Sequence, residues 1–215
     1  MNGACAIDDD GTLLWNSRIS HGDRFRLSDI NPDRPGQEVF AIQQNAGDML
    51  GQILYDARNG EAIKKWYLSS VGDVGRGECM DVDPAHKGYE MWSTMANIYN
   101  AQGDAIGSAK PYPYEGVWWD GDLGRETVMT SGSGNNCPII IAKYNGTDTW
   151  NRLNQISRDA NWAVCAENAV RPMFWGDIYG DWREELVLKQ TIGGEECGFV
   201  AFTTNYATTI DNIYC

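Results

Sequence analysis

The sequence predicts an all-β protein and, within that class, a β-propeller to which the chain contributes about four blades. A short acidic loop that runs into an apolar stretch occurs four times, and it alternates with a glycine-containing hairpin turn. Successive copies are roughly 40 to 57 residues apart, the range of propeller blades. No stretch longer than a turn or two keeps a helical period. Because such units cannot bury both faces alone, we expect them to pack radially, as a small ring or as about half of a larger one.

The expected hairpins have apolar flanks around turns of the Asp-Gly and Asn-Gly type. They lie at residues 4–15, 54–63, 98–106 and 141–150. Two further stretches, residues 108–115 and 131–136, have the proline, glycine and serine content of loops.

The first acidic loop, at residues 29–40, has the pattern of a calcium site. Side-chain oxygens of Asp29, Asn31 and Asp33 alternate, Gly36 lets the backbone wrap, and Glu38 follows at the start of a strand. Calcium takes six to eight oxygen ligands in such flexible arrangements. A solvated turn is the alternative for any single copy. Since the pattern returns, we expect ions in at least two of the four loops.

The other three copies are variations on this loop. Their candidate metal ligands are Asp81, Asp83 and Glu90 in the second loop, Asp120, Asp122 and Glu126 in the third, and Asp177, Asp181 and Glu185 in the fourth. Ala85 replaces one ligand of the second loop, and Tyr179 replaces one ligand of the fourth.

Composition limits the possible partners. A formal net charge of -13 argues against nucleic acid and suits a protein that binds several calcium ions. Six scattered cysteines without a Cys-x-x-Cys pair disfavour zinc, and some of them could pair in an oxidising compartment. No apolar run is long enough to span a membrane, and no signal peptide is visible at the start. The strand-like beginning and abrupt end suggest a fragment.

Three stretches stand apart from the repeat, each immediately before an acidic loop: residues 20–25 with His21, residues 72–78 with Arg76, and residues 170–176 with Arg171. In a propeller they would emerge at the same end of their blades, which favours a shared site. Each side chain also has a simpler reading, as a structural hydrogen-bonding histidine or as an ion-pair partner of the many carboxylates. Trp118 and Trp119 fit either a core or a sugar-binding surface.

At these positions the chain resembles the family 11 polysaccharide lyases, the rhamnogalacturonan lyases. The strings that carry the resemblance are His-Gly-Asp-Arg-Phe at 21–25, Asp-Arg-Pro-Gly at 33–36, Gly-Arg-Gly at 75–77, Trp-Trp-Asp-Gly-Asp-Leu at 118–123 and Gly-Asp-Ile-Tyr-Gly-Asp-Trp-Arg-Glu-Glu at 176–185. They occur in the family's order and cover nearly the whole chain.

The resemblance implies a secreted, eight-bladed propeller with structural calcium ions, of which this chain is roughly the C-terminal half. The missing blades of the same polypeptide would be its partner, so we expect the isolated chain to be inactive or poorly soluble. The implied reaction is β-elimination between rhamnose and galacturonate in pectic rhamnogalacturonan I. Calcium or arginine would neutralise the uronate carboxylate and stabilise the transition state, so we expect the acidic loops at the substrate end.

Individual roles follow from matching positions. The resemblance implies that Arg76 binds the uronate carboxylate and that His21 contacts substrate or calcium. We also expect Asp23, Trp118 and Trp119 to bind substrate. Well-known family members carry a catalytic lysine where this chain has Ala-Glu-Asn-Ala at 166–169. Arginine is a poor base and imidazole a better one. We therefore assign His21 as base, with Arg76 and Arg171 as electrostatic stabilisers.

Two other classes of protein remain open. A non-catalytic, calcium-loaded propeller that binds carbohydrate or protein would need none of these three side chains to converge. A quinoprotein-like dehydrogenase propeller is weaker, since Trp15, Trp66, Trp92 and Trp150 do not hold one register.

Overall fold

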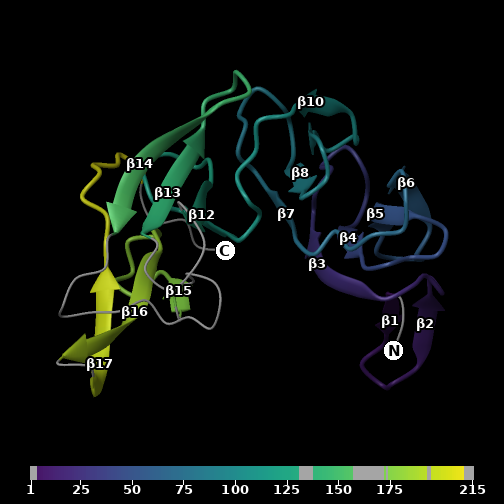
Figure 1. Cartoon of the computed structure of the whole chain (residues 1–215), viewed down its shortest axis with the longest axis horizontal. Coiled ribbons are helices and arrows are strands. Elements are labelled where there is room, and N and C mark those ends of the chain that lie inside the picture. Colours follow the sequence, from purple (N-terminus) through teal and green to yellow (C-terminus); the bar gives the residue numbers. More distant parts are fainter. Residues whose placement is uncertain (1–3, 131–137, 157–171, 173, 193–194, 211–215) are drawn as a thin grey trace. The chain divides into compact units, whose positions relative to one another are not determined.

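The computed structural model describes residues 4–130, 138–156, 172, 174–192 and 195–210. All regular elements in these ranges are β-strands, and every pairing between them is antiparallel (Figure 1). A search of the same ranges for a helix able to cross a membrane finds none. The all-β prediction is therefore confirmed. No sheet in the described part of the chain closes on itself.

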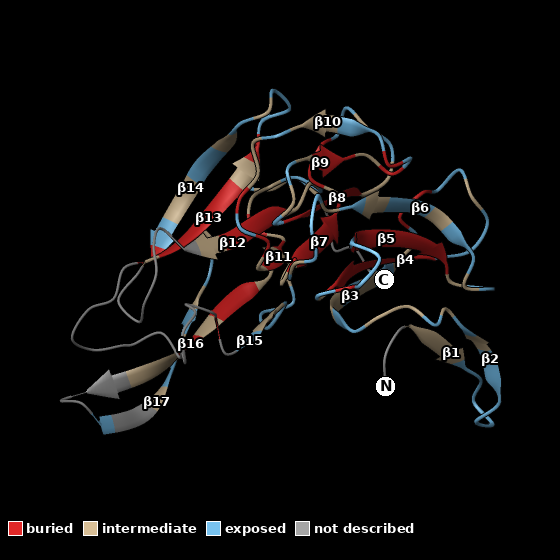
Figure 2. Cartoon of the chain, turned by 45° about the vertical axis from the view of Figure 1, so that its right-hand side comes forward, coloured by how far each residue is buried: buried red, intermediate tan, exposed pale blue. Residues whose placement is uncertain are grey.

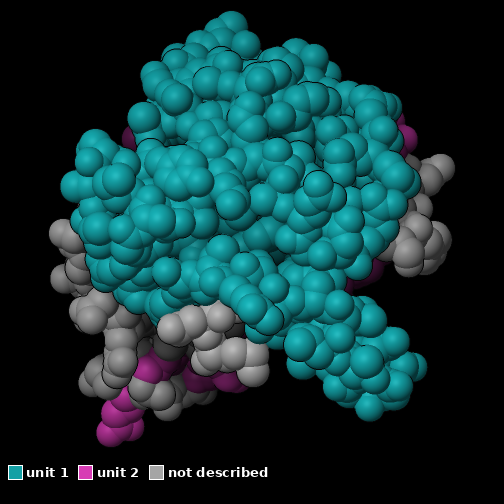
Figure 3. Space-filling view, turned by 90° about the vertical axis from the view of Figure 1, so that its right-hand side faces the viewer, with its two compact units in different colours: residues 1–113, 146–149 teal, residues 114–145, 150–215 magenta. Residues whose placement is uncertain are grey.

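The chain divides into two compact units, coloured separately in Figure 3. The first comprises residues 1–113 and 146–149, and the second comprises residues 114–145 and 150–215.

Unit 1 contains a hairpin and two four-stranded meanders. The hairpin pairs β1 (Cys5–Ile7) with β2 (Leu13–Asn16). The first meander is formed by β3 (Gly22–Ser28), β4 (Glu38–Gln43), β5 (Leu50–Asp56) and β6 (Ala62–Tyr67). The second is formed by β7 (Gly77–Met80), β8 (Glu90–Ser93), β9 (Ile98–Tyr99) and β10 (Ala105–Gly107).

Unit 2 contains a four-stranded and a three-stranded meander. The former consists of β11 (Glu115–Val117), β12 (Glu126–Thr130), β13 (Ile139–Tyr144) and β14 (Trp150–Ile156). The latter consists of β15 (Phe174–Gly176), β16 (Glu185–Ile192) and β17 (Glu195–Phe202).

The core of unit 1 forms where its two meanders pack together. Phe40 and Leu54 of the first meander share one apolar cluster with Cys79 and Met91 of the second. The strands β4, β5, β7 and β8 are buried along their whole length, whereas β6 has mostly exposed residues (Figure 2). Full burial of one such large apolar side chain stabilises the fold by about 1.5–3 kcal/mol.

The alternation expected from the sequence is confirmed. Every acidic loop joins the first strand of a meander to the second, and the turns at residues 57–61, 100–104 and 145–149 join the third strand to the fourth. The hairpin predicted at residues 4–15 is the β1–β2 pair.

The same topology corrects one expectation. His21 precedes β3 and Asp29 follows it, so the seven residues of this strand separate the two side chains. At about 3.3 Å per residue the strand itself is about 23 Å long. Arg76 and the second acidic loop likewise stand at opposite ends of β7. The first two acidic loops therefore do not lie at the end of the sheet where His21 and Arg76 lie.

Candidate functional site

The end of β4 brings together two connections that are far apart in sequence. The backbone N–H of Gln44 donates to the carbonyl oxygen of His21 at 2.9 Å, and the N–H of Asn45 donates to that of Gly72 at 2.9 Å. Gln44 also forms an isolated β-bridge with Asp73. The stretches that carry His21 and Arg76 are thereby placed on either side of one strand end.

Asp23 is the centre of the polar cluster formed there. Its Oδ1 lies 3.5 Å from His21 Nε2, and the carboxyl group of Asp73 lies near enough to affect its pKa. Burial raises the pKa of Asp23 and the Asp73 carboxylate raises it further, while His21 and Arg76 oppose the shift. Gln44 Nε2 donates to Asp73 Oδ2 at 3.0 Å.

Arg76 stands on a constrained turn. Gly75 has a φ of +72°, which favours glycine, and the N–H of Arg76 donates to the carbonyl oxygen of Val74 at 2.8 Å. The N–H of Thr94 donates to the Arg76 carbonyl oxygen at 3.2 Å. Arg76 Nη1 donates to the Gly75 carbonyl oxygen at 2.8 Å, and the charge of the guanidinium lowers the pKa of Asp23. Arg171 lies outside the described residues.

A cavity of about 660 Å³ adjoins this cluster in unit 1. His21, Asp23 and Arg24 line its polar side, and residues of the β1–β2 hairpin and of β3 line its apolar side. The His21 side chain is 54% exposed, so it is accessible to a ligand. Sequence reasoning missed Asp73 and Gln44, although Asp73 stands in the stretch that was singled out for Arg76.

A buried glutamate opens the second strand of each meander and holds the acidic loop before it. One oxygen of each carboxyl group accepts two backbone N–H groups of its own loop. The pairs are Glu38 Oε2 with Ile30 and Asn31, Glu90 Oε2 with Val82 and Asp83, Glu126 Oε2 with Trp119 and Asp120, and Glu185 Oε2 with Ile178 and Tyr179. All four side chains are 0% exposed. These glutamates, predicted only as ion ligands, also fix the loop backbone.

Cationic side chains already form ion pairs with carboxylates in and beside the first loop. Arg34 Nε lies 3.4 Å from Glu38 Oε1, and Arg34 Nη2 donates to Asp56 Oδ2 at 3.2 Å. Asp33 is exposed and pairs with Lys87. The predicted ligands Asp29, Asn31, Asp33 and Glu38 do not form a carboxylate cluster in this arrangement.

The second loop contains a buried carboxylate with an unused oxygen. Glu90 Oε1 is buried and has no hydrogen-bond partner. Burial raises the pKa of Glu90 to about 8, the N–H donors of Val82 and Asp83 oppose this shift, and the nearby carboxylates of Asp81 and Asp83 reinforce it. Asp83 Oδ2 lies 2.9 Å from His86 Nδ1. A cation beside Glu90 Oε1 would relieve this unfavourable burial.

The third loop brings three carboxylates together. Oxygens of Asp120, Asp122 and Glu126 lie within 4.8 Å of one another, close enough to hold one metal ion. This is the single such group of three that a search of the described residues finds. The ammonium group of Lys143 lies among the three carboxylates.

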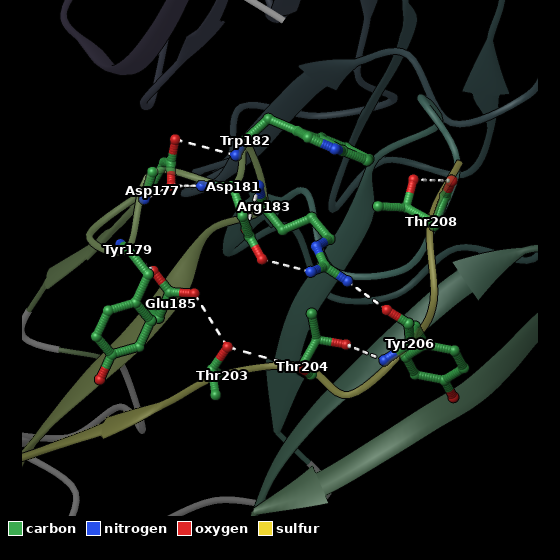
Figure 4. Close-up of polar contacts among 12 residues, drawn as sticks. Asp177, Tyr179, Asp181, Trp182, Arg183, Glu185, Thr203, Thr204, Tyr206 and Thr208 are labelled. Carbon is green, nitrogen blue, oxygen red and sulfur yellow. Dashed lines mark hydrogen bonds and ion pairs between the residues drawn. The ribbon is translucent and has the colours of Figure 1, made fainter. Parts of the chain in front are cut away.

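In the fourth loop the carboxylates accept hydrogen bonds from the loop's own backbone and pair with its own side chains, as Figure 4 shows. Asp177 accepts the N–H groups of Gly180, Asp181 and Trp182 at 2.6, 2.9 and 3.1 Å. Asp181 pairs with Arg183, which also donates to the carbonyl oxygen of Tyr206. The predicted ligands Asp177, Asp181 and Glu185 do not converge here. Their role as ligands stays a prediction.

The two adjacent tryptophans have different environments. Trp119 is 3% exposed, and its Nε1 donates to Asn154 Oδ1 at 2.7 Å, so its ring belongs to the core of unit 2. Trp118 is half-buried, with the Arg125 guanidinium 3.9 Å from its ring centroid. The predicted sugar-binding role therefore rests on Trp118.

Successive antiparallel meanders with buried loop glutamates, and a His21–Asp23 pair beside a cavity in unit 1, define a repeat-built all-β protein with a candidate polar site. Comparison with known proteins makes this specific. Residues 1–212 match the model of the rhamnogalacturonan lyase family 11 C-terminal domain. The chain belongs to this family, which confirms the resemblance noted in the sequence.

Two relatives come from Bacillus subtilis strain 168. The chain is 34% identical to the rhamnogalacturonan endolyase YesW over 190 residues, which are 86% of the chain and 28% of that protein. It is 32% identical to the rhamnogalacturonan exolyase YesX over 196 residues, which are 86% of the chain and 31% of that protein. Among solved structures, the Bacillus licheniformis PL11 rhamnogalacturonan lyase matches with a TM-score of 0.80 and 32% identity over 99% of this chain and 34% of that one. The chain thus spans about a third of these relatives' length.

Proposed function

We propose that the chain is part of a secreted, calcium-dependent polysaccharide lyase that cleaves pectic rhamnogalacturonan I between rhamnose and galacturonate by β-elimination. Its meanders would be blades of an eight-bladed propeller completed by the rest of the polypeptide. Membership of the rhamnogalacturonan lyase family supports the substrate class. The observation that carries the proposal is the position of His21 beside Asp23 in the lining of a cavity, with the charge of Arg76 acting on the same carboxyl group.

In the proposed mechanism, Arg76 binds the uronate carboxylate. Neutralising that group stabilises the enolate-like transition state that forms when the C5 proton leaves. His21 accepts this proton, and the glycosidic oxygen then departs from C4 with its bonding electrons. Because Nε2 of His21 faces Asp23, Nδ1 is the nitrogen that accepts the proton. The Asp23–Asp73 pair orients the imidazole.

Calcium has a structural place in this proposal. The second acidic loop fits the ion, because Glu90 Oε1 is buried without a hydrogen-bond partner and Asp81 and Asp83 contribute further carboxylates. An ion held there would neutralise the loop and fix its conformation. The loop lies at the other end of β7 from Arg76. The arginine, rather than this calcium ion, would therefore neutralise the uronate carboxylate of the substrate.

The alternative of a non-catalytic, carbohydrate- or protein-binding propeller predicts that His21 and Arg76 are dispersed in separate ion pairs. Their common position beside Asp23 favours the lyase. The test is incubation of the full-length protein with rhamnogalacturonan I, with and without chelator, followed by ultraviolet absorbance of the unsaturated uronate. Absorbance that grows in calcium supports the lyase. Binding of the polysaccharide without any absorbance would establish the alternative.

A further inference from the structure

We propose that the ammonium group of Lys143 is the resident cation of the third acidic loop, so that this loop is closed by a side chain and takes no calcium ion. This inference concerns the loop alone and does not depend on the lyase activity.

The geometry around Lys143 is that of an occupied cation site. Its Nζ donates to Asp120 Oδ2 at 2.6 Å and to Asp122 Oδ2 at 2.7 Å, and it lies 3.2 Å from Glu126 Oε1 in an ion pair. An ammonium group has three N–H donors, and three carboxylates surround this one. Calcium binds oxygens at 2.3–2.6 Å. An ion at the centre of the three carboxylates would therefore need the space that the ammonium holds.

The charges agree with this arrangement. Burial raises the pKa of Glu126 to about 7, and Lys143 opposes that shift. Burial would lower the pKa of Lys143, but hydrogen bonds to Asp120 and Asp122 and the charge of Glu126 raise it overall. The ammonium thus stays charged among these carboxylates. It supplies the positive charge that a calcium ion would otherwise bring.

Strand register explains why the third strand supplies a cation to this loop and not to the second loop. The pair Thr127–Ala142 aligns Lys143 with the loop glutamate, Glu126, on the neighbouring strand. In the second loop, the pair Met91–Tyr99 aligns Asn100 with Glu90 in the same way. The Asn100 side chain accepts the N–H groups of its own turn, so it brings no positive charge to Glu90. This position of the third strand therefore places a cation beside the third loop's glutamate and none beside the second loop's.

The experiment is a count of bound calcium ions in the full-length protein after removal of metal by chelator. Lys143→Asn places the second loop's residue in the third loop, and Lys65→Asn, at an exposed position of β6, is the matched control. We expect Lys143→Asn to bind one ion more per chain than both the wild type and the control. Terbium luminescence excited through tryptophan should gain one site in the same variant. An unchanged count in folded Lys143→Asn would overturn the inference.

A second measurement uses the wild type and does not depend on the variant's folding. The Lys143 amine is engaged by three carboxylates and its side chain is 22% exposed, so it should resist acylation in calcium-free protein. Mass spectrometry of acylated protein then shows whether calcium changes this. Continued protection in calcium supports a resident ammonium, whereas rapid labelling after calcium addition shows that the ion displaces it.

Discussion

Glu90 Oε2 accepts the backbone N–H of Asp83 at 2.9 Å, while Oε1 of the same carboxyl group is buried without a hydrogen-bond partner. The carboxyl group therefore fixes its loop with one oxygen and leaves the other for a cation. Three of the four loop glutamates have an Oε1 of this kind, but Arg34 faces the one in Glu38 and Lys143 faces the one in Glu126. Among the described residues, Glu90 Oε1 is the one of these three oxygens that no lysine or arginine faces, so an ion bound there would stabilise the loop.

The first prediction concerns pH. In calcium-free protein the pKa of Glu90 is raised from 4.5 to about 8, so between these values the folded state binds more protons than the unfolded state. The free energy of unfolding should therefore fall as pH rises from about 4.5 to 8, by up to a few kcal/mol at 1.4 kcal/mol per pKa unit. Urea unfolding of wild type and Glu90→Gln at several pH values measures it. In Glu90→Gln the free energy of unfolding should depend much less on pH over this range. Adding calcium at pH 8 should raise the free energy of unfolding of the wild type but not that of the variant.

The second prediction concerns the loop glutamate itself. Glu185→Ala leaves the N–H groups of Ile178 and Tyr179 without their acceptor and removes the partner of the Thr203 hydroxyl. Each hydrogen bond to a charged acceptor contributes about 1.5–3 kcal/mol, so the free energy of unfolding should fall by roughly 2–5 kcal/mol. Glu185→Gln keeps an acceptor oxygen and should lose less than half as much. Equal losses in chemical denaturation would show that charge, rather than hydrogen bonding, holds the loop.

Local patterns in the sequence predicted the elements but not which of them meet. The Asp-Gly and Asn-Gly turns and the acidic loops are each set by a few neighbouring residues, and all appear between the expected strands. The Asp23–Asp73 contact and the Lys143–Glu126 pair depend on strand register and on pairing between distant segments. No local spacing encodes these contacts.

The prediction that the acidic loops lie at the substrate end was wrong for a related reason. Adjacency in sequence suggested that His21 and the loop beginning at Asp29 lie together, but the residues between them form one extended strand. A strand of this length places its two flanking segments at opposite ends of the sheet. Likewise, the spacing of the carboxylates could not reveal that the loop glutamates serve the backbone, since their N–H donors come from apolar positions as well as acidic ones.

The third prediction tests His21 as the base. His21→Gln removes an imidazole that is 54% exposed and forms no part of the apolar core, so the thermal midpoint should stay within about 2 °C while the elimination rate falls by 10²-fold or more. Lys65→Asn, at an exposed position of β6, is the control. The elimination rate of each variant is measured as the initial increase in ultraviolet absorbance of the unsaturated uronate. A fully active His21→Gln protein would exclude His21 as the base.

The last prediction separates charge from geometry at Arg76. A guanidinium binds a carboxylate through two parallel N–H donors, whereas an ammonium offers a point charge. Arg76→Lys should therefore retain part of the activity, and Arg76→Ala should lose about 10²–10³-fold in kcat, as for removal of one transition-state donor. Arg58→Lys is the control, because Arg58 pairs with Asp56 in the turn after β5, away from the cluster. If Arg76 acts on the developing charge, the loss falls on kcat more than on KM. A loss confined to KM in both variants would instead assign Arg76 to substrate binding alone and leave transition-state stabilisation to another group.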